Sequence, residues 1–147
     1  MKTRREILFR GKTSDGEWVE GDVLQTRYHS GHIEYQIMPQ TPVSSAYPVL
    51  SETVGQYTGL TDKNGKRIFE GDILQGEQYP FKSDGKYNYF VEVCYWDNAP
   101  EFGIYTFKNP KADIRGICEG NTDDMQDWES SAWEIIGNIH DDLELME

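Results

Sequence analysis

Residues 57–75 read YTGLTDKNGKRIFEGDILQ, and residues 9–25 read FRGKTSDGEWVEGDVLQ. Both stretches run from an aromatic residue through x-Gly-x-Thr and a Gly-containing turn to Glu-Gly-Asp, an aliphatic residue, Leu and Gln. Asn-Gly or Asp-Gly between apolar segments predicts a β-hairpin, because glycine accepts the positive φ that tight turns require. The later copy is two residues longer around the turn, where insertions are tolerated. We therefore predict one hairpin used twice.

The two Gly-Asp pairs within this repeat, Gly21-Asp22 and Gly71-Asp72, are the first candidate site residues. Glycine inside a strand often marks a bulge or bend of the kind that small barrels need to close, and Asp bonds readily to neighbouring backbone. We predict structural repeat turns at matching bends, in which both carboxylates accept hydrogen bonds from nearby backbone. Two alternatives stay open: a catalytic dyad in which Asp22 and Asp72 share a proton, and a hard-cation site formed with the two preceding glutamates.

The rest of the chain favours a single mainly β domain over residues 1–147. Val, Ile and aromatic residues alternate with polar ones in several short segments, which is the period-two pattern of half-buried strands. Residues 102–107 should return antiparallel to residues 89–96, and the proline-containing segment 39–52 should be loop or sheet edge, because proline lacks a backbone donor. The other predicted strands are 5–10, 33–37 and 133–140.

The segment NTDDMQDWESS predicts a short helix near residues 122–130. Asn121 or Thr122 can cap its first turn. The carboxylates of Asp123 and Asp124 are favourable in that turn, because they face the positive end of the helix dipole. We therefore expect one helix close to the C-terminus of an otherwise β-rich chain.

Charge and hydropathy argue against several function classes. The 147 residues carry a net charge of −12, and residues 113–147 hold 11 acidic residues against one basic residue. Attraction to phosphates dominates nucleic-acid affinity, so direct nucleic-acid binding is disfavoured. No apolar run approaches the roughly 20 residues of a membrane span. The apolar run at residues 7–9 is too short for a secretory signal, so we expect a cytoplasmic protein.

Histidine and cysteine give no catalytic or metal constellation. His29 and His32 have the spacing of a metal-ligand pair without further partners, and His140 stands alone beside two aspartates, so we expect solvated surface at both places. Cys94 has no base beside it in the sequence and is expected to be a small buried or half-buried thiol. The chain contains no P-loop, dinucleotide fingerprint or Gly-x-Ser-x-Gly elbow. We predict a non-enzymatic protein with no cofactor and no metal.

Aromatic and acidic residues supply candidates for an interaction surface. Trp18, Tyr57, Tyr95 and Trp96 suit a stacking platform for single strands, but such platforms work with a positive groove. Packing in the core or against a partner is therefore favoured. The acidic last quarter either keeps the protein soluble or attracts a basic partner, as an acidic mimic of nucleic acid does. Its candidate residues are Asp123, Asp124 and Asp127.

Residues 52–74, ETVGQYTGLTDKNGKRIFEGDIL, resemble the signature of the YopX family of bacteriophage and prophage proteins. FRGK followed by WVEGDVL near the start, and WEIIGNIHDDLEL near the end, fit the same pattern, so the resemblance spans the whole chain. It implies a mainly β fold of SH3-like barrel type and a phage or prophage origin, hence a bacterial cytoplasm. It supplies no established activity, substrate or catalytic residue.

Together these observations predict a small SH3-like barrel with two similar hairpins and a short helix near the C-terminus. We expect a non-enzymatic interaction module that binds a protein partner or self-associates, since exposed strand edges invite pairing. The alternatives are a small β-barrel that binds nucleic acid and an acidic nucleic-acid mimic that acts on a host protein.

Overall fold

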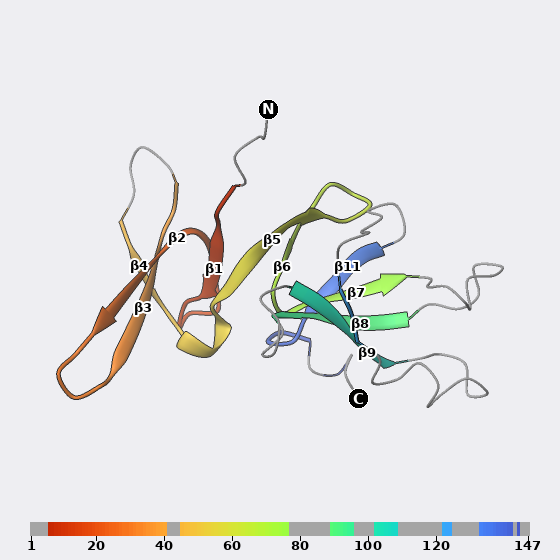
Figure 1. The fold of residues 1–147 in the computed structure, drawn as a ribbon. Coiled ribbons are helices and arrows are strands. Elements are labelled where there is room, and N and C mark those ends of the chain that lie inside the picture. Colours follow the sequence, from red (N-terminus) through yellow and green to blue (C-terminus); the bar gives the residue numbers. More distant parts are fainter. Residues whose placement is uncertain are drawn as a thin grey trace. The chain divides into compact units, whose positions relative to one another are not determined.

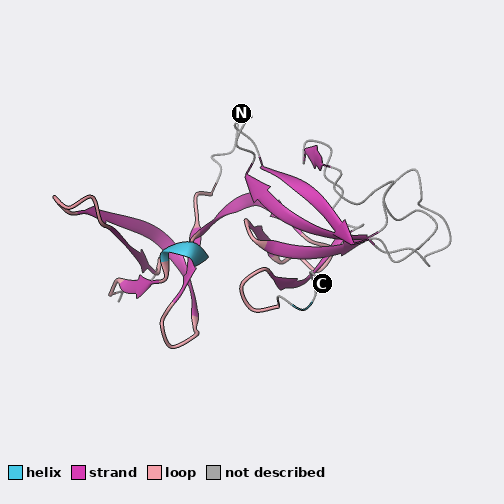
Figure 2. Cartoon of the chain, turned by 90° about the horizontal axis from the view of Figure 1, so that it is seen from below, coloured by secondary structure: helices cyan, strands magenta, loops and turns pink. Residues whose placement is uncertain are grey.

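The computed structural model describes residues 6–40, 45–76, 89–95, 102–108, 122–124, 133–142 and 144. Within these ranges every element is a β-strand except η1 (Ser51–Thr53), a single 3₁₀ turn (Figure 2). The prediction of a mainly β chain is confirmed. The chain divides into two compact units, an N-terminal unit (Met1–Gly59) and a C-terminal unit (Leu60–Glu147). A single domain over residues 1–147 stays a prediction.

The N-terminal unit is an antiparallel sheet in the order β4-β3-β2-β1-β5 (Figure 1). The long β2 pairs with β1 through its first half and with β3 through its second half, which places Gly21 opposite Phe9 and Val23 opposite Ile37. Ile37 is fully buried, whereas the far end of β2 is exposed. The strands are β1 (Phe9–Lys12), β2 (Trp18–Arg27), β3 (Ile33–Met38), β4 (Tyr47–Val49) and β5 (Gly55–Thr61), the last of which continues into the C-terminal unit.

The strand β4 is a short edge strand, as its proline predicts. The backbone N–H of Tyr28 donates to the carbonyl of His32 at 2.9 Å, so even-numbered residues of β3 hydrogen-bond to β2 and odd-numbered residues to β4. The β3–β4 ladder ends at the pair Tyr35–Val49. Pro48 directly precedes Val49, so its nitrogen faces away from β3 and the ladder loses no donor.

Three hairpins share one loop geometry, at residues 13–17, 28–32 and 62–66. In each loop the first residue donates its N–H to the carbonyl of the fifth, and the fourth donates to the carbonyl of the first, at 2.8–3.0 Å. The fourth residue is always a glycine with φ between 79° and 90°. This is a three-residue hairpin loop with a left-handed glycine at its end. The predicted turns at SDG and KNG are confirmed, and HSG forms a third one.

The C-terminal unit contains a five-stranded antiparallel sheet in the order β10-β9-β8-β7-β11. For β8, β9 and β10 the backbone is described, together with the side chain of Val93. The core joins Ile68, Leu74, Val93 and Trp133 from four strands. The predicted antiparallel pairing of β8 with β9 is confirmed. The strands are β6 (Arg67–Phe69), β7 (Asp72–Gly76), β8 (Tyr89–Tyr95), β9 (Phe102–Lys108), β10 (Thr122–Asp124) and β11 (Trp133–Asn138).

The predicted helix near residues 122–130 is wrong at its start. Thr122–Asp124 form β10, which pairs with β9 from Thr122 opposite Tyr105 to Asp124 opposite Gly103. Residues 125–130 lie outside the described residues. Favourable capping residues are a weak local preference, and pairing with an existing strand edge satisfies the same backbone groups. No closed barrel is found among the described strands.

Candidate functional site

The first Gly-Asp pair lies inside the continuous strand β2. Gly21 is buried, and a Cβ at this position would collide with the backbone carbonyl of Met38. Asp22 is exposed, and its Oδ1 accepts a hydrogen bond from Nε2 of Gln40 at 2.7 Å. The carboxylate therefore bonds to a side chain, and the prediction that Asp22 bonds to nearby backbone is wrong.

The second Gly-Asp pair begins in the turn that separates β6 from β7. Gly71 has a φ of 93°, in the left-handed region, whereas Gly21 does not have a positive φ. The N–H of Gly71 donates to the carbonyl of Val93 at 2.8 Å, and its carbonyl accepts from Ile139 at 2.9 Å. The two Gly-Asp pairs are therefore not at matching bends. Gly71 ties the β6–β7 turn to β8 and to the turn that follows β11.

Asp72 has the structural role that the sequence predicts. It is only 2% exposed, and its Oδ2 accepts a hydrogen bond from the backbone N–H of Phe69 at 2.8 Å. Asp22 and Asp72 thus differ in burial, and each is held by a donor of its own unit. Among the described residues, no group of three or more His, Cys, Asp or Glu side chains is placed to hold a metal ion.

The most heavily bonded carboxylate belongs to Asp62, which sequence reasoning missed. This side chain is 2% exposed. Its Oδ1 accepts from the backbone N–H groups of Asn64 and Lys66, both at 2.9 Å, and its Oδ2 accepts from Ile135 at 3.1 Å. Burial alone acts to raise the pKa of Asp62, but the hydrogen bonds from Ile135, Lys66 and Asn64 outweigh burial and lower it below 3.8.

Thr13 occupies the position of Asp62 in the first hairpin. Its Oγ1 accepts from the N–H of Glu17 at 3.2 Å, which corresponds to the bond from Lys66 to Asp62. The sequence signal that locates both is a polar residue three positions before the turn glycine. Only Asp62 has a second oxygen that reaches another strand, so the later hairpin is fastened to β11 through Ile135.

Further contacts hold the same hairpin to β11. The backbone N–H of Lys63 donates to the carbonyl of Trp133 at 2.9 Å, and its Nζ lies 3.2 Å from Oε2 of Glu134. Nδ2 of Asn64 lies 3.4 Å from Oε1 of the same glutamate. The hairpin loop of the second copy of the repeat is therefore held against β11 within the C-terminal unit.

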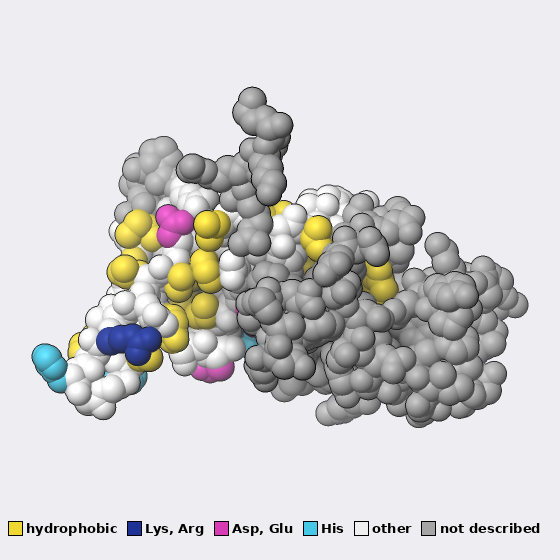
Figure 3. Space-filling model, in the orientation of Figure 1, with side chains coloured by type: hydrophobic (Ala, Val, Ile, Leu, Met, Phe, Trp, Pro, Cys, Tyr) yellow, Lys and Arg dark blue, Asp and Glu magenta, His cyan; other side chains and the backbone are white. Residues whose placement is uncertain are grey.

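The accessible candidate surface belongs to the N-terminal unit. Six large hydrophobic side chains are exposed among the described residues, and all six lie before residue 60. Figure 3 shows hydrophobic side chains gathered on this unit. Leu24 lies opposite Gln36, and Met38 lies opposite Asp22, so Leu24 and Met38 are diagonal neighbours on one face of β2 and β3. The six residues are Ile7, Leu24, Tyr28, Met38, Tyr47 and Leu50.

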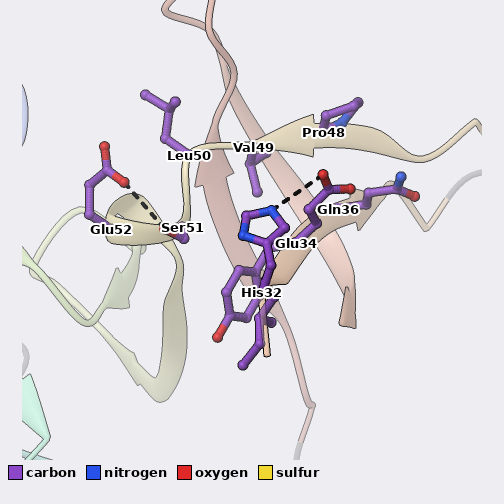
Figure 4. Close-up of a pocket in the computed structure, with 10 residues that line it drawn as sticks. His32, Glu34, Gln36, Pro48, Val49, Leu50, Ser51 and Glu52 are labelled. Carbon is purple, nitrogen blue, oxygen red and sulfur yellow. Dashed lines mark hydrogen bonds and ion pairs between the residues drawn. The ribbon is translucent and has the colours of Figure 1, made fainter. Parts of the chain in front are cut away.

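A groove opens in this unit between the start of β3 and the segment that joins β4 to η1 (Figure 4). Its volume is about 460 Å³, and it is lined by residues 32–36 and 48–52. Oε1 of Glu34 lies 3.5 Å from Nε2 of His32, and Oε2 accepts from the hydroxyl of Tyr28 at 3.0 Å. On the opposite wall the hydroxyl of Ser51 donates to Glu52 at 3.4 Å. The lining is mixed, with apolar walls and two carboxylates.

Comparison with known proteins identifies the family. The family model described as "YopX protein" matches residues 8–147. The chain belongs to the YopX family. No curated protein matches it. The crystal structure of protein EF1440 from Enterococcus faecalis is similar, with a TM-score of 0.51 and 22% identity over 98% of this chain and 100% of that one. This likeness concerns the fold alone.

Among the described residues of the YopX-family chain, the aromatic candidates Trp18 and Tyr57 do not form an accessible platform. Trp18 is half-buried, with the guanidinium of Arg10 4.8 Å from its ring centroid, and Tyr57 is buried in β5. Trp96 and Asp127 lie outside the described residues. For Asp123 and Asp124 the backbone of β10 is described, and their role as an acidic surface stays a prediction.

Two of the three histidine candidates, His32 and His140, make local contacts in the YopX-family chain. His29 lies in the third hairpin loop, and the ring of His32 stacks on Tyr28 with 5.7 Å between centroids. The backbone N–H of His140 donates to Oδ1 of Asn138 at 2.9 Å. Cys94 lies in β8, where its side chain is not described. The described part of the chain has no helix that is long and apolar enough to cross a membrane.

Proposed function

We propose that this YopX-family protein is a non-enzymatic interaction module of phage or prophage origin that binds a protein partner in the bacterial cytoplasm. The exposed face at Leu24 and Met38 carries this proposal. Both side chains are large, apolar and exposed, by 49% and 39%, on neighbouring strands. Exposed apolar residues gathered together are a feature of protein interfaces. Nucleic acid would meet a net charge of −12, which opposes binding to phosphates.

We further propose that the N-terminal unit is a small SH3-like barrel. The hydrogen bond from Leu50 N–H to the carbonyl of Lys12, at 2.8 Å, supports it, because it joins the end of β4 to β1 at the far side of the sheet. A Cβ at Gly11 would lie 2.7 Å from Cγ2 of Val49, so the same two strands also approach through their side chains. β5 then adds to the free edge of β1.

Partner capture with matched variants tests the proposed function. Wild-type protein, L24S/M38S and T26S are used as bait in host lysate with and without phage gene expression. Thr26 lies on the same face of β2 as Leu24 and serves as the control. We expect wild type and T26S to recover a partner that L24S/M38S loses, because the double variant removes the apolar contact and keeps the backbone.

Two other results would replace this proposal. A wild-type protein that sediments as a multimer, while L24S/M38S is monomeric, would identify the partner as a second copy of the chain. Retention of single-stranded or duplex nucleic acid at low salt, falling steeply as salt rises, would support the nucleic-acid alternative. A monomer that recovers no partner in any lysate contradicts the proposed function.

A further inference from the structure

The strand β3 is paired with β4 along only part of its length. Its ladder with β4 ends at the pair Tyr35–Val49. Leu50, which follows β4, donates its N–H to the carbonyl of Lys12, and Ser51, the next residue that would face β3, already begins η1. The chain therefore turns away from β3 toward β1, and the groove lies in the space that β4 would occupy if it continued.

This departure leaves the backbone of Ile33 facing the groove. Odd-numbered residues of β3 point their N–H and C=O groups toward β4, as Tyr35 does, whereas Glu34 points toward Thr26 of β2. Ile33 lies one hydrogen-bonding step beyond the last β3–β4 pair. A strand edge that presents a donor and an acceptor is a template for an added strand. The groove volume of about 460 Å³ leaves room for part of an extended chain.

The side chains around this edge select the kind of chain that fits. Glu34 projects from β3 and Glu52 from η1, while Pro48, Val49 and Leu50 supply apolar surface along one wall (Figure 4). Among the described residues that line the groove there is no Lys or Arg, and the one basic group is the imidazole of His32. Two carboxylates beside an apolar wall favour an occupant that carries both a positive charge and apolar side chains.

We propose that this groove binds an extended segment of a partner protein, which adds a short strand to β3 at Ile33 and places a Lys or Arg side chain near Glu34 and Glu52. An apolar side chain of the segment packs on Leu50 and Pro48. Main-chain hydrogen bonds supply affinity without sequence preference, and the two carboxylates supply selectivity for a basic residue. This inference rests on the proposed function, because it names a binding surface and the chemistry of its partner.

A displayed library of random twelve-residue peptides, selected on the full-length protein, tests the selectivity. We expect enrichment of peptides with a Lys or Arg flanked by apolar residues. A fluorescein-labelled enriched peptide is then titrated by anisotropy against wild type, E34Q/E52Q and E20Q. The double variant should bind about 10-fold more weakly, because it removes both exposed ion pairs with the basic residue of the peptide. The E20Q variant removes one charge from exposed surface of β2 outside the groove and should bind as wild type does.

Amide hydrogen exchange tests the added strand. Saturation with the enriched peptide should slow exchange at Ile33 by at least 10-fold, because its N–H gains a main-chain acceptor. Glu34 is the internal control, because its backbone already faces Thr26. Methylation of single peptide nitrogens should weaken binding most at the one position whose N–H donates to the carbonyl of Ile33. Unchanged exchange at Ile33 with bound peptide overturns the added strand.

The variants separate this inference from the proposed function. One outcome is that E34Q/E52Q binds the enriched peptides and the captured partner as tightly as wild type while L24S/M38S loses both. That result keeps the proposed function as an interaction module and overturns the groove proposal. If no peptide is enriched but E34Q/E52Q retains the captured partner, the groove proposal fails in the same way. Absence of both enriched peptides and partner removes the two proposals together.

Discussion

Replacing Asp62 with Ala removes the acceptor of three backbone hydrogen bonds, from Asn64, Lys66 and Ile135. Hydrogen bonds to a charged acceptor contribute about 1.5 to 3 kcal/mol each, and water can replace the carboxylate at the two donors in the loop. We therefore expect D62A to lower the free energy of unfolding of the C-terminal unit by about 3 to 5 kcal/mol. D62T places threonine, the residue at the matching position of the first hairpin, at position 62. The variant should keep the hydrogen bond within the loop and lose the one from Ile135, which should lower the free energy of unfolding by about 2 kcal/mol.

The contribution of Asp62 depends on pH in a defined direction. Burial opposes the charged form, but the hydrogen bonds from Ile135, Lys66 and Asn64, with the charge of Lys66, hold the folded pKa below 3.8. Because the folded pKa is lower than the unfolded pKa, the stabilisation is complete above about pH 4 and is lost as pH falls through the folded value. Wild type and D62A should therefore differ most near neutral pH and converge in acid.

Urea unfolding and exchange of the Ile135 amide measure these effects, the second reporting directly on the lost bond. T13A is the matched control, because it removes one neutral hydrogen bond in the first hairpin and should cost about 0.5 to 1 kcal/mol. It should leave exchange at Ile135 unchanged. If D62T and T13A lose equal amounts of unfolding free energy, or if the loss in D62A persists unchanged in acid, Asp62 does not hold the second hairpin to β11.

Three further outcomes follow from the same structure. D72A should destabilise the protein by about 1 to 3 kcal/mol because it removes a buried carboxylate that accepts from the backbone N–H of Phe69, whereas D22A at the exposed position should cost less than about 0.5 kcal/mol by urea unfolding. G71A should cost about 1 to 2 kcal/mol, because alanine is strained at a φ of 93°. E34Q should lower the pKa of Tyr28 toward 10.0 in an NMR titration, because the hydrogen bond to Glu34 and then its charge raise that pKa in the wild type.

The hairpins could be predicted from the sequence because their signals are local. Asp15-Gly16 and Asn64-Gly65 each supply the left-handed glycine that ends the loop. At Ser30-Gly31, where the same geometry occurs, the sequence indicates only a polar loop, because serine before glycine is a weaker signal than Asn or Asp. The groove was not predictable, since it depends on where β4 leaves β3, and Ser51, the next residue that would face β3, lies in η1 without a local sequence signal for that turn.

The two copies of the repeat show why the same Glu-Gly-Asp sequence adopts two different conformations. Gly16 and Asp22 are six positions apart, whereas Gly65 and Asp72 are seven apart. The extra residue falls at the turn that separates β6 from β7, whereas β2 runs without a break through Gly21 and Asp22. Asp22 is consequently exposed on a continuous strand, while Asp72 is buried after a turn that absorbs the extra residue at Gly71. The Glu-Gly-Asp sequence is therefore the same in both copies, but it lies one position farther from the turn glycine in the second copy.

The hydrogen bond between Asp62 and Ile135 also sets the order in which parts of the fold can form during synthesis. Its partners are 73 residues apart, whereas the pairings among β1 to β5 of the N-terminal unit lie within residues 6–59. A ribosome adds about 5 to 20 residues per second, so the carboxylate is synthesised roughly 4 to 15 s before its donor. During that interval β7 has no β11 beside it, so one edge of β7 presents backbone donors and acceptors without their partner strand. The N-terminal unit is complete before the C-terminal unit receives its last strand.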